Sequence, residues 1–209
     1  MGTGYLMQRL GAVILSGGAS RRMKQNKAFL TFDNETFLNR IHKQLSGFEE
    51  ILLSVDSTEK YVSEDIPKDI IVVQDIYHDC GALCGIFSAL RVCKSDYLFV
   101  ISCDMPLFEK SLADYMCSFV DGKHDAYVIV TRDGRLQPQC AIYSSAVADI
   151  MEECILAGKC KIIAPYDRIR VKYISLHNTA FSDNIVRGVN TPIEYQELLS
   201  KQTLGPISD

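Results

Sequence analysis

The residues best suited to chemistry follow an apolar segment near the start of the chain. Gly17 and Gly18 come directly after that segment. Because glycine reaches backbone conformations that other residues avoid, main-chain N–H groups there can close on a ligand. Arg21, Arg22 and Lys27 follow and add positive charge. A short strand, a glycine turn and a basic cluster in this order predict a site that binds phosphate groups.

The glycine pair matches neither of the two common phosphate-binding motifs. The chain has no Gly-x-Gly-x-x-Gly after the first predicted strand and no Gly-x-x-x-x-Gly-Lys-Ser/Thr. These absences disfavour a dinucleotide-binding dehydrogenase and a P-loop kinase or GTPase. The alternative that needs no ligand is a tight turn between strand and helix, with solvated arginines and a surface lysine.

Two aspartates stand at the ends of other apolar segments. Asp104 follows residues 97–101, and an ionised carboxylate at such a place is costly unless it gains a partner, for example Mg²⁺ shared with substrate phosphates. Asp75 follows residues 70–73, where it could accept hydrogen bonds from a sugar hydroxyl or a base edge. The alternative for both aspartates, and for Asn190 before a predicted helix, is a capping or turn role.

An alternation of strands and helices must position these residues. Apolar runs predict strands at 12–15, 51–55, 70–73, 97–101, 126–131, 139–143 and 171–176. Helical spacing predicts helices at 36–45, 86–93, 111–119, 144–156 and from 191 onward. This order predicts an α/β fold with a doubly wound, mostly parallel sheet.

The fold class predicts where the chemistry gathers. Ligands of open α/β sheets bind beyond the carboxyl ends of the strands, so Ser54, Asp75 and Asp104 should converge on the glycine turn. Residues 81–85, which carry two further glycines, are expected to form a second loop that opens the next helix.

Composition and charge exclude some classes of protein. A chain of 209 residues that is 47% hydrophobic and 23% charged favours one folded domain over disorder. The formal net charge of −4 argues against a nucleic-acid partner bound through the overall field. No apolar run approaches the roughly 20 residues that span a bilayer, and the first residues do not resemble a signal peptide. We therefore expect a cytoplasmic protein without a membrane partner.

The eight cysteines contain no Cys-x-x-Cys pair, and several lie inside apolar runs. We expect reduced, mostly buried thiols. The alternative is a structural zinc site built from His78, Cys80 and Cys84, although no second cluster with ligand spacing accompanies them.

With these residues assembled, the sequence resembles the molybdenum cofactor guanylyltransferases over about residues 10–200. The first glycine motif with its lysine is shared by many nucleotidyltransferases, whereas its combination with the later motifs is more particular to the molybdopterin branch. The motifs that carry the resemblance are residues 15–23 with Lys27, 81–85, 103–106, 137–141 and 189–192. Lys24, Asn26, Ala82 and Cys84 depart from the family pattern, while the lysine spacing and the glycines are kept.

The resemblance implies a three-layer fold of the nucleotide-diphospho-sugar transferase type, with a Rossmann-like nucleotide-binding half. It implies one nucleotidyltransferase domain at 8–200, divided into a nucleotide-binding half at 10–106 and an acceptor-binding half at 107–200. Residues 1–7 and 204–209 would be tails.

The resemblance also implies roles for individual residues. Arg22 and Lys27 would contact the triphosphate, Asp104 would hold Mg²⁺, and these three would be catalytic. Asp75 would bind the nucleoside, and Asn190 would lie near the molybdopterin. The implied nucleotide-binding set is Leu15, Ser16, Gly17, Gly18, Lys27, Asp75 and Asp104, and Ser54 occupies a further nucleoside-contact position.

The implied activity is transfer of GMP from GTP to molybdopterin with release of pyrophosphate. The implied protein partners are molybdoenzymes or their chaperones. Three alternatives remain at this point. The first is a cytidylyltransferase that acts on molybdopterin or another phosphorylated acceptor. The second is a non-catalytic nucleotide-binding partner in molybdoenzyme maturation. The third is a cysteine-rich redox or metal module.

Overall fold

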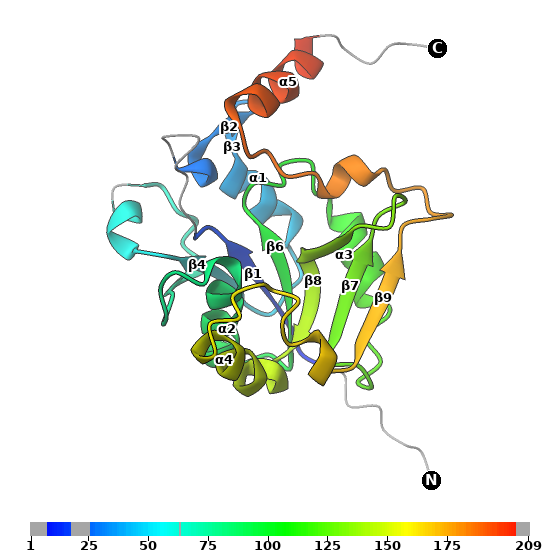
Figure 1. The fold of residues 1–209 in the computed structure, drawn as a ribbon. Helices are drawn as coiled ribbons and strands as arrows, with labels where there is room; N and C mark the ends of the chain where they lie inside the picture. Colours follow the sequence, from blue (N-terminus) through cyan, green and yellow to red (C-terminus); the bar gives the residue numbers. More distant parts are fainter. Residues whose placement is uncertain (1–7, 18–25, 63, 204–209) are drawn as a thin grey trace.

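The computed structural model describes residues 8–17, 26–62 and 64–203, and a seven-stranded sheet forms the centre of this part (Figure 1). The strands lie in the order β5-β4-β1-β6-β8-β7-β9. Their bounds are β1 Leu10–Leu15, β4 Ile51–Val55, β5 Ile70–Gln74, β6 Tyr97–Ser102, β7 Ala126–Val130, β8 Leu136–Ser144 and β9 Val171–Ser175.

Most neighbouring strands of the sheet are parallel. β1 runs parallel to both β4 and β6, and β4 runs parallel to β5. β8 is antiparallel to β6 and β7, while β7 and β9 are parallel. A short turn with Gly134 at φ 83° joins β7 to β8, and so short a connection can join only antiparallel neighbours. The predicted doubly wound, mostly parallel sheet is confirmed.

Helices cover both faces of the sheet, which gives three layers (Figure 1). Leu38 and Leu112, from α1 and α3, lie in the core on one face. Phe87 and Met151, from α2 and α4, lie in the core on the other face. Side chains of each buried strand alternate between these two cores. The helices are α1 Phe37–Gln44, α2 Gly81–Val92, α3 Lys110–Cys117, α4 Ala148–Leu156 and α5 Pro192–Thr203.

The last helix packs away from the sheet, beside a small hairpin that the sequence did not predict (Figure 1). The hairpin consists of β2 (Thr31–Phe32) and β3 (Glu35–Thr36). The Tyr195 hydroxyl donates to the Thr31 carbonyl at 2.7 Å. A separate apolar core joins helix and hairpin, and its buried members are Leu30, Phe32, Phe37, Val189 and Leu198.

The second glycine segment is helical, so the prediction of a loop at residues 81–85 is wrong. α2 begins at Gly81. Leu83 and Cys84 are 0% and 1% exposed, because the first helical turn packs both side chains against the sheet. A loop at these positions would leave them in contact with water.

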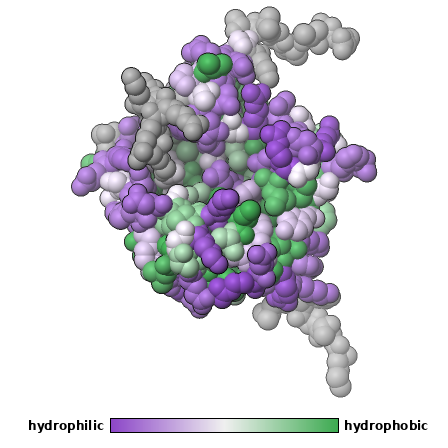
Figure 2. All heavy atoms as spheres, viewed as in Figure 1, coloured by the Kyte–Doolittle hydropathy of each residue, from purple (hydrophilic) through white to green (hydrophobic). Residues whose placement is uncertain are grey.

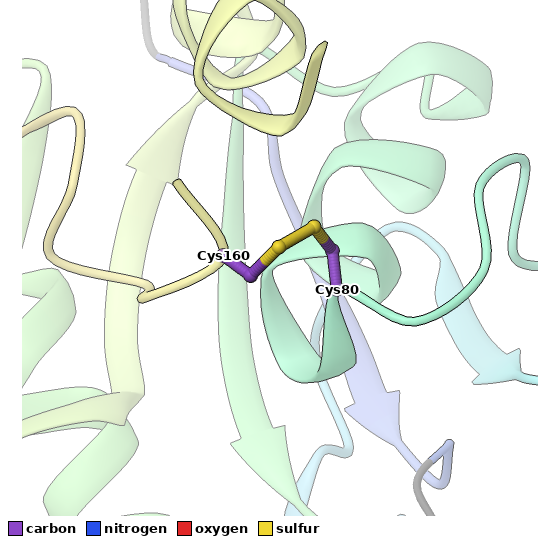
Figure 3. The surroundings of a disulfide bond; sticks show 2 residues. All are labelled: Cys80 and Cys160. Carbon is purple, nitrogen blue, oxygen red and sulfur yellow. A yellow bond between two sulfur atoms is a disulfide. The ribbon is translucent and has the colours of Figure 1, made fainter. Parts of the chain in front are cut away.

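Two of the cysteines form a disulfide, so the expectation of reduced thiols is wrong for this pair. Cys80 precedes α2, Cys160 follows α4, and their Cα atoms are 4.6 Å apart (Figure 3). α2 and α4 lie side by side on one face of the sheet, and this packing brings together residues that are 80 positions apart. Cys80 also belonged to the alternative zinc site, and in the disulfide its sulfur is no metal ligand.

The surface shown in Figure 2 is largely hydrophilic, with hydrophobic side chains in smaller groups between the polar ones. Among the described residues, none of the helices combines the length and the apolar character that crossing a bilayer requires.

Candidate active site

Lys27, Asp104 and Asn190 meet beyond the carboxyl end of β6, and we refer to them as the Lys27 cluster. The Lys27 ammonium donates to Asp104 Oδ2 at 3.0 Å and to Asn190 Oδ1 at 2.7 Å. The side chains of Lys27 and Asp104 are only 16% and 12% exposed. Because water is partly excluded, charges here interact more strongly than they would on the open surface.

The first two members of the cluster are positioned by short, well-anchored turns. Lys27 opens the 3-10 turn Lys27–Phe29, and Asn26 caps this turn by accepting from the Ala28 N–H at 3.1 Å. Asp104 lies just past β6, and its carbonyl accepts from the Val189 N–H at 2.8 Å. This last bond ties the end of β6 to the segment that carries Asn190.

Asn190 is held by the cap of α5. Glu194 accepts from the N–H groups of Asn190 and Thr191 at 2.7 and 2.9 Å, and Thr191 Oγ1 accepts from the Glu194 N–H at 3.2 Å. This reciprocal pattern is a capping box, with Thr191 as the N-cap of α5. The Asn190 side chain takes no part in capping, and its amide oxygen is therefore free to hold Lys27.

A second polar pair lies on the neighbouring strands. Ser54 in β4 donates to Asp75 Oδ1 at 2.7 Å, and both residues are buried. Backbone at two glycines approaches the pair closely. A methyl group at Gly17 would lie 3.1 Å from Asp75 Oδ2, and one at Gly85 would lie 2.6 Å from Ser54 Oγ. The prediction that Ser54 and Asp75 converge on the glycine turn is met at Gly17.

Asp75 titrates close to neutral pH. Burial raises the pKa of its carboxyl to about 6, although the hydrogen bond from Ser54 lowers it. Because a pKa of about 6 still lies below 7, the carboxylate is mostly ionised at neutral pH and can accept hydrogen bonds from hydroxyl or amino groups of a ligand.

Leu15 and Ser16 are fixed by bonds to their neighbours. The Leu15 carbonyl accepts from the Cys103 N–H at 2.9 Å, and the Ser16 N–H donates to the Ser54 carbonyl at 2.8 Å. The Tyr61 hydroxyl lies 2.7 Å from both the carbonyl and the hydroxyl of Ser16. Each carbonyl oxygen has a second lone pair, so this rigid backbone can still accept a hydrogen bond from a ligand.

A polar cavity of about 620 Å³ opens beside Asp104 and Asn190. Its walls come from the end of β6, the β7–β8 turn, the start of β8 and the segment before α5. Arg135, Arg187 and the amides of Gln137, Gln139 and Asn184 give it both donors and acceptors. A second, more open cavity of about 520 Å³ lies between the first turn of α2, the loop after Cys160 and Gln139.

The magnesium ion implied by the resemblance fits Asp104. Within the described part of the chain, Asp104 Oδ1 has no hydrogen-bond partner, and the residue lines the larger cavity. No group of three or more His, Cys, Asp or Glu side chains that could hold a metal occurs among the described residues. Magnesium does not need such a group, since it often takes one or two carboxylates and completes its shell with phosphate oxygens and water.

The structure thus brings together most of the residues that the sequence singled out. Lys27, Asp104 and Asn190 form one cluster, and Asp75 and Gly17 lie in the second polar group. Gly18 and Arg22, together with Arg21 and Lys24, lie outside the described residues, and their predicted roles stay predictions.

Sequence reasoning missed Tyr61, which lies in a polar stretch with no helical or strand periodicity. Only the three-dimensional contact with Ser16 reveals it. It also missed Tyr143 and Tyr166, whose hydroxyls pair inside the protein at 2.7 Å. Neither tyrosine carries a sequence signal beyond an apolar pattern.

Comparison with known proteins places the chain among nucleotidyltransferases. Residues 12–169 match the family model described as the MobA-like NTP transferase domain. The "Probable molybdenum cofactor guanylyltransferase" of Clostridium perfringens (strain SM101 / Type A) is 34% identical over 207 residues, which is 95% of this chain and 100% of that protein. The protein of the same name from Pelotomaculum thermopropionicum is 38% identical over 192 residues, 90% of each chain.

A solved structure shows the same fold. The crystal structure of "Molybdopterin-guanine dinucleotide biosynthesis protein A" from Archaeoglobus fulgidus superposes with a TM-score of 0.79 at 21% identity. The match covers 93% of this chain and 99% of that one. The three-layer fold of the nucleotide-diphospho-sugar transferase type, with its Rossmann-like half, is thereby confirmed.

Proposed function

Because the chain belongs to the MobA-like NTP transferase family, together with the molybdenum cofactor guanylyltransferases, we propose that it transfers GMP from GTP to molybdopterin. The product is the guanine dinucleotide form of the molybdenum cofactor, and pyrophosphate is released. The chain is a nucleotidyltransferase; the use of Mg²⁺ and the roles of individual residues belong to the proposal.

The observation that carries the proposal is the position of the Lys27 cluster. In the strand order, Gly17 after β1 and Asp75 after β5 lie on one side of Asp104, which follows β6, and there we place the guanosine. On the other side lies the polar cavity of about 620 Å³, where we place the molybdopterin. A cation held between a nucleotide edge and a polar acceptor cavity suits the transfer of a phosphate-containing group between them.

In the proposed reaction a phosphate oxygen of molybdopterin attacks the α-phosphorus of GTP. A new P–O bond forms, the bond between the α-phosphorus and the bridging oxygen breaks, and pyrophosphate leaves with the electron pair. Lys27 stabilises the charge that develops on the phosphates, and its bonds to Asp104 and Asn190 keep it in place. Bound Mg²⁺, held by Asp104, would supply further neutralisation of phosphate charge.

This transfer needs no covalent protein intermediate, and the protonation state of two nearby cysteines, Cys103 and Cys140, agrees with this. Burial raises the pKa values of both Cys103 and Cys140 to about 12. These thiols therefore stay protonated and poorly nucleophilic at neutral pH.

The two sides of the site suggest how the chain divides between its two substrates. We propose that residues 10–106 bind the nucleotide and residues 107–200 bind the acceptor, within a single domain at 8–200. Support comes from the walls of the larger cavity, most of which belong to the second range. Arg22 would add to Lys27 at the triphosphate, and molybdoenzymes or their chaperones would receive the product.

Isotope labels test the proposed reaction directly. With molybdopterin present, label from the α-phosphate of GTP should appear in the acceptor, while label from the γ-phosphate should appear in pyrophosphate. Release of label from the γ-phosphate as inorganic phosphate, with none transferred from the α-position, would contradict the proposal. The binding-partner alternative predicts neither transfer, although GTP would still bind in calorimetry.

Acid should weaken GTP binding through Asp75. Protonation of this carboxylate removes an acceptor for the nucleoside, so KM for GTP is expected to rise below pH 6, approaching about tenfold per pH unit. Initial rates at varied GTP between pH 5 and 8 measure the effect. The matched variant is Asp75→Asn, which keeps an acceptor for Ser54 but cannot titrate.

In Asp75→Asn we expect KM for GTP to be raised at every pH and to change little between pH 5 and 8. The pKa of Asp75 is raised in the folded state, so this group favours folding more as the pH falls through 6, and the acid effect is not an unfolding caused by Asp75. A wild-type KM that does not change between pH 5 and 7 would remove Asp75 from the nucleoside site.

A further inference from the structure

The β8 strand carries an irregularity at the point where it enters the active site. Val128 of β7 pairs with Ala141 of β8, but the next residue, Ile129, pairs with Gln137. One step along β7 therefore corresponds to four steps along β8, and residues 138–140 bulge out of this ladder. Bulges of this kind redirect side chains and often occur next to active sites.

The bulge presents Gln139 to both cavities. Gln139 lines the larger cavity together with Asp104 and Asn190, and it also lines the second cavity beside the first turn of α2. Within the described part of the chain, its amide has no hydrogen-bond partner. An amide with two donor hydrogens and an acceptor oxygen can pair with the amide-like ring edge of a pterin.

A buried tyrosine anchors the bulge. Tyr143 is 0% exposed, and its hydroxyl donates to the Pro138 carbonyl at 2.9 Å. Its oxygen lies 2.7 Å from the Tyr166 hydroxyl, and because the Tyr143 hydrogen is already used, Tyr166 must be the donor in that pair. Burial raises the pKa values of both phenols, so both keep the protons that these bonds require.

The Tyr143–Tyr166 pair is connected to α2, on the nucleotide side of the molecule. Tyr166 lies six positions after Cys160, which the disulfide joins to Cys80 at the start of α2. The loop between these positions is closed by turns, in which the Tyr166 N–H donates to the Ile163 carbonyl at 3.1 Å. The bulge of β8 is thus fixed against the helix that borders Ser54 and Asp75 on the nucleotide side.

Resting on the proposed function, we propose that Tyr143 and Tyr166 are positioning residues that hold the β8 bulge so that the Gln139 amide meets the acceptor. Gln139 touches the ring edge of a phosphorylated heterocycle such as a pterin. The two phenols act only through Pro138 and the backbone of the bulge. Neither the family match nor the names of the relatives assigns these roles.

Steady-state kinetics with Tyr143→Phe tests the inference. The variant keeps the ring and loses both hydroxyl bonds, so KM for molybdopterin should rise about five- to tenfold. KM for GTP should change less than about twofold, and kcat less than about threefold. Tyr166→Phe keeps the bond to Pro138 and should show a smaller effect of about two- to threefold. Because Tyr166 is less buried than Tyr143, Tyr166→Phe is used for the test if Tyr143→Phe does not fold.

A double-mutant cycle separates positioning from general stability. Gln139→Ala should raise KM for the acceptor about tenfold, and adding Tyr143→Phe to it should change that KM less than about twofold. The matched control is Tyr127→Phe, in which another tyrosine that is 0% exposed loses its hydroxyl and the 2.7 Å bond to Asp121, away from both cavities. It should lower the melting temperature without changing either KM.

Additive effects of the two substitutions would overturn the inference. So would equal rises in both KM values, or a lower melting temperature with no change in KM. Turnover by the wild-type protein distinguishes failure of the proposed function from failure of the positioning roles of Tyr143 and Tyr166. Absence of GMP transfer by the wild-type protein would overturn the proposed function together with this inference, whereas transfer with the wrong variant pattern would overturn this inference alone.

Discussion

Replacing Asp104 by alanine is expected to lower kcat for GMP transfer by about 100- to 1,000-fold. The substitution removes the carboxylate that would hold Mg²⁺ and the main partner of the Lys27 ammonium, with which it forms a 3.0 Å ion pair. Charge that develops on the phosphates would then lack the Mg²⁺, and Lys27 would be held by Asn190 alone. Single-turnover rates at saturating GTP and molybdopterin measure this effect without interference from binding.

The fold should survive this change. The Asp104 side chain borders a cavity and no part of either sheet core, and Lys27 keeps its bond to Asn190. We expect a loss of about 1–3 kcal/mol in the free energy of unfolding, measured with urea. Asp104→Asn is the matched variant, since it keeps the shape and an oxygen for Lys27 but loses the charge. Wild-type turnover in either variant would contradict the role of Asp104.

Replacing Lys27 by methionine is expected to lower kcat/KM by about 100- to 1,000-fold. Methionine fills much the same space, but it cannot neutralise the phosphates of GTP, and it leaves Asp104 without its cation in a place where the side chain is 12% exposed. We expect a loss in kcat, because the charge on the leaving pyrophosphate grows as the reaction proceeds.

Lys110→Met is the matched control for this substitution. Lys110 pairs with Asp114 at 2.8 Å on the surface of α3, and an exposed pair of this kind contributes at most about 1 kcal/mol. Its kinetics should equal those of the wild-type protein. If Lys27→Met kept its kcat and lost only GTP affinity, Lys27 would be a binding residue and the mechanism proposed above would be wrong.

The sheet could be predicted because its strands carry their signal locally. The runs that became β1, β4 and β6 are mainly apolar, with one serine each in β4 and β6, as expected of parallel strands buried on both faces. The start of α1 is local in the same way, since Thr36, the first residue of the predicted helix 36–45, accepts from the Asn39 N–H and caps the helix. Once these strands are known to be parallel, Asp75 and Asp104 must lie at one edge.

Other features depend on contacts between distant residues, and no local pattern shows them. Lys27 and Asn190 are 163 positions apart, and they meet because the small core of the β2–β3 hairpin and α5 brings their segments together. β2 and β3 have two residues each, too few for a periodic signal. The Cys80–Cys160 disulfide depends in the same way on the packing of α2 against α4.

The bulge in β8 shows a third limit. Residues 136–144 have a strand composition, but the pairing with β7 slips by three residues in the middle. The sequence predicts only the shorter strand at 139–143, because Pro138 interrupts the pattern. The anchor that makes the slip possible, the Tyr143 hydroxyl, is set by tertiary structure.

The most direct test of the account is to incubate the protein with molybdopterin, Mg²⁺ and each of the four nucleoside triphosphates in turn. We expect a dinucleotide product and an equimolar amount of pyrophosphate with GTP, and at most a few per cent of that rate with ATP, UTP or CTP. Equal or faster turnover with CTP would make the protein a cytidylyltransferase. No product with any of the four would contradict nucleotidyl transfer to molybdopterin.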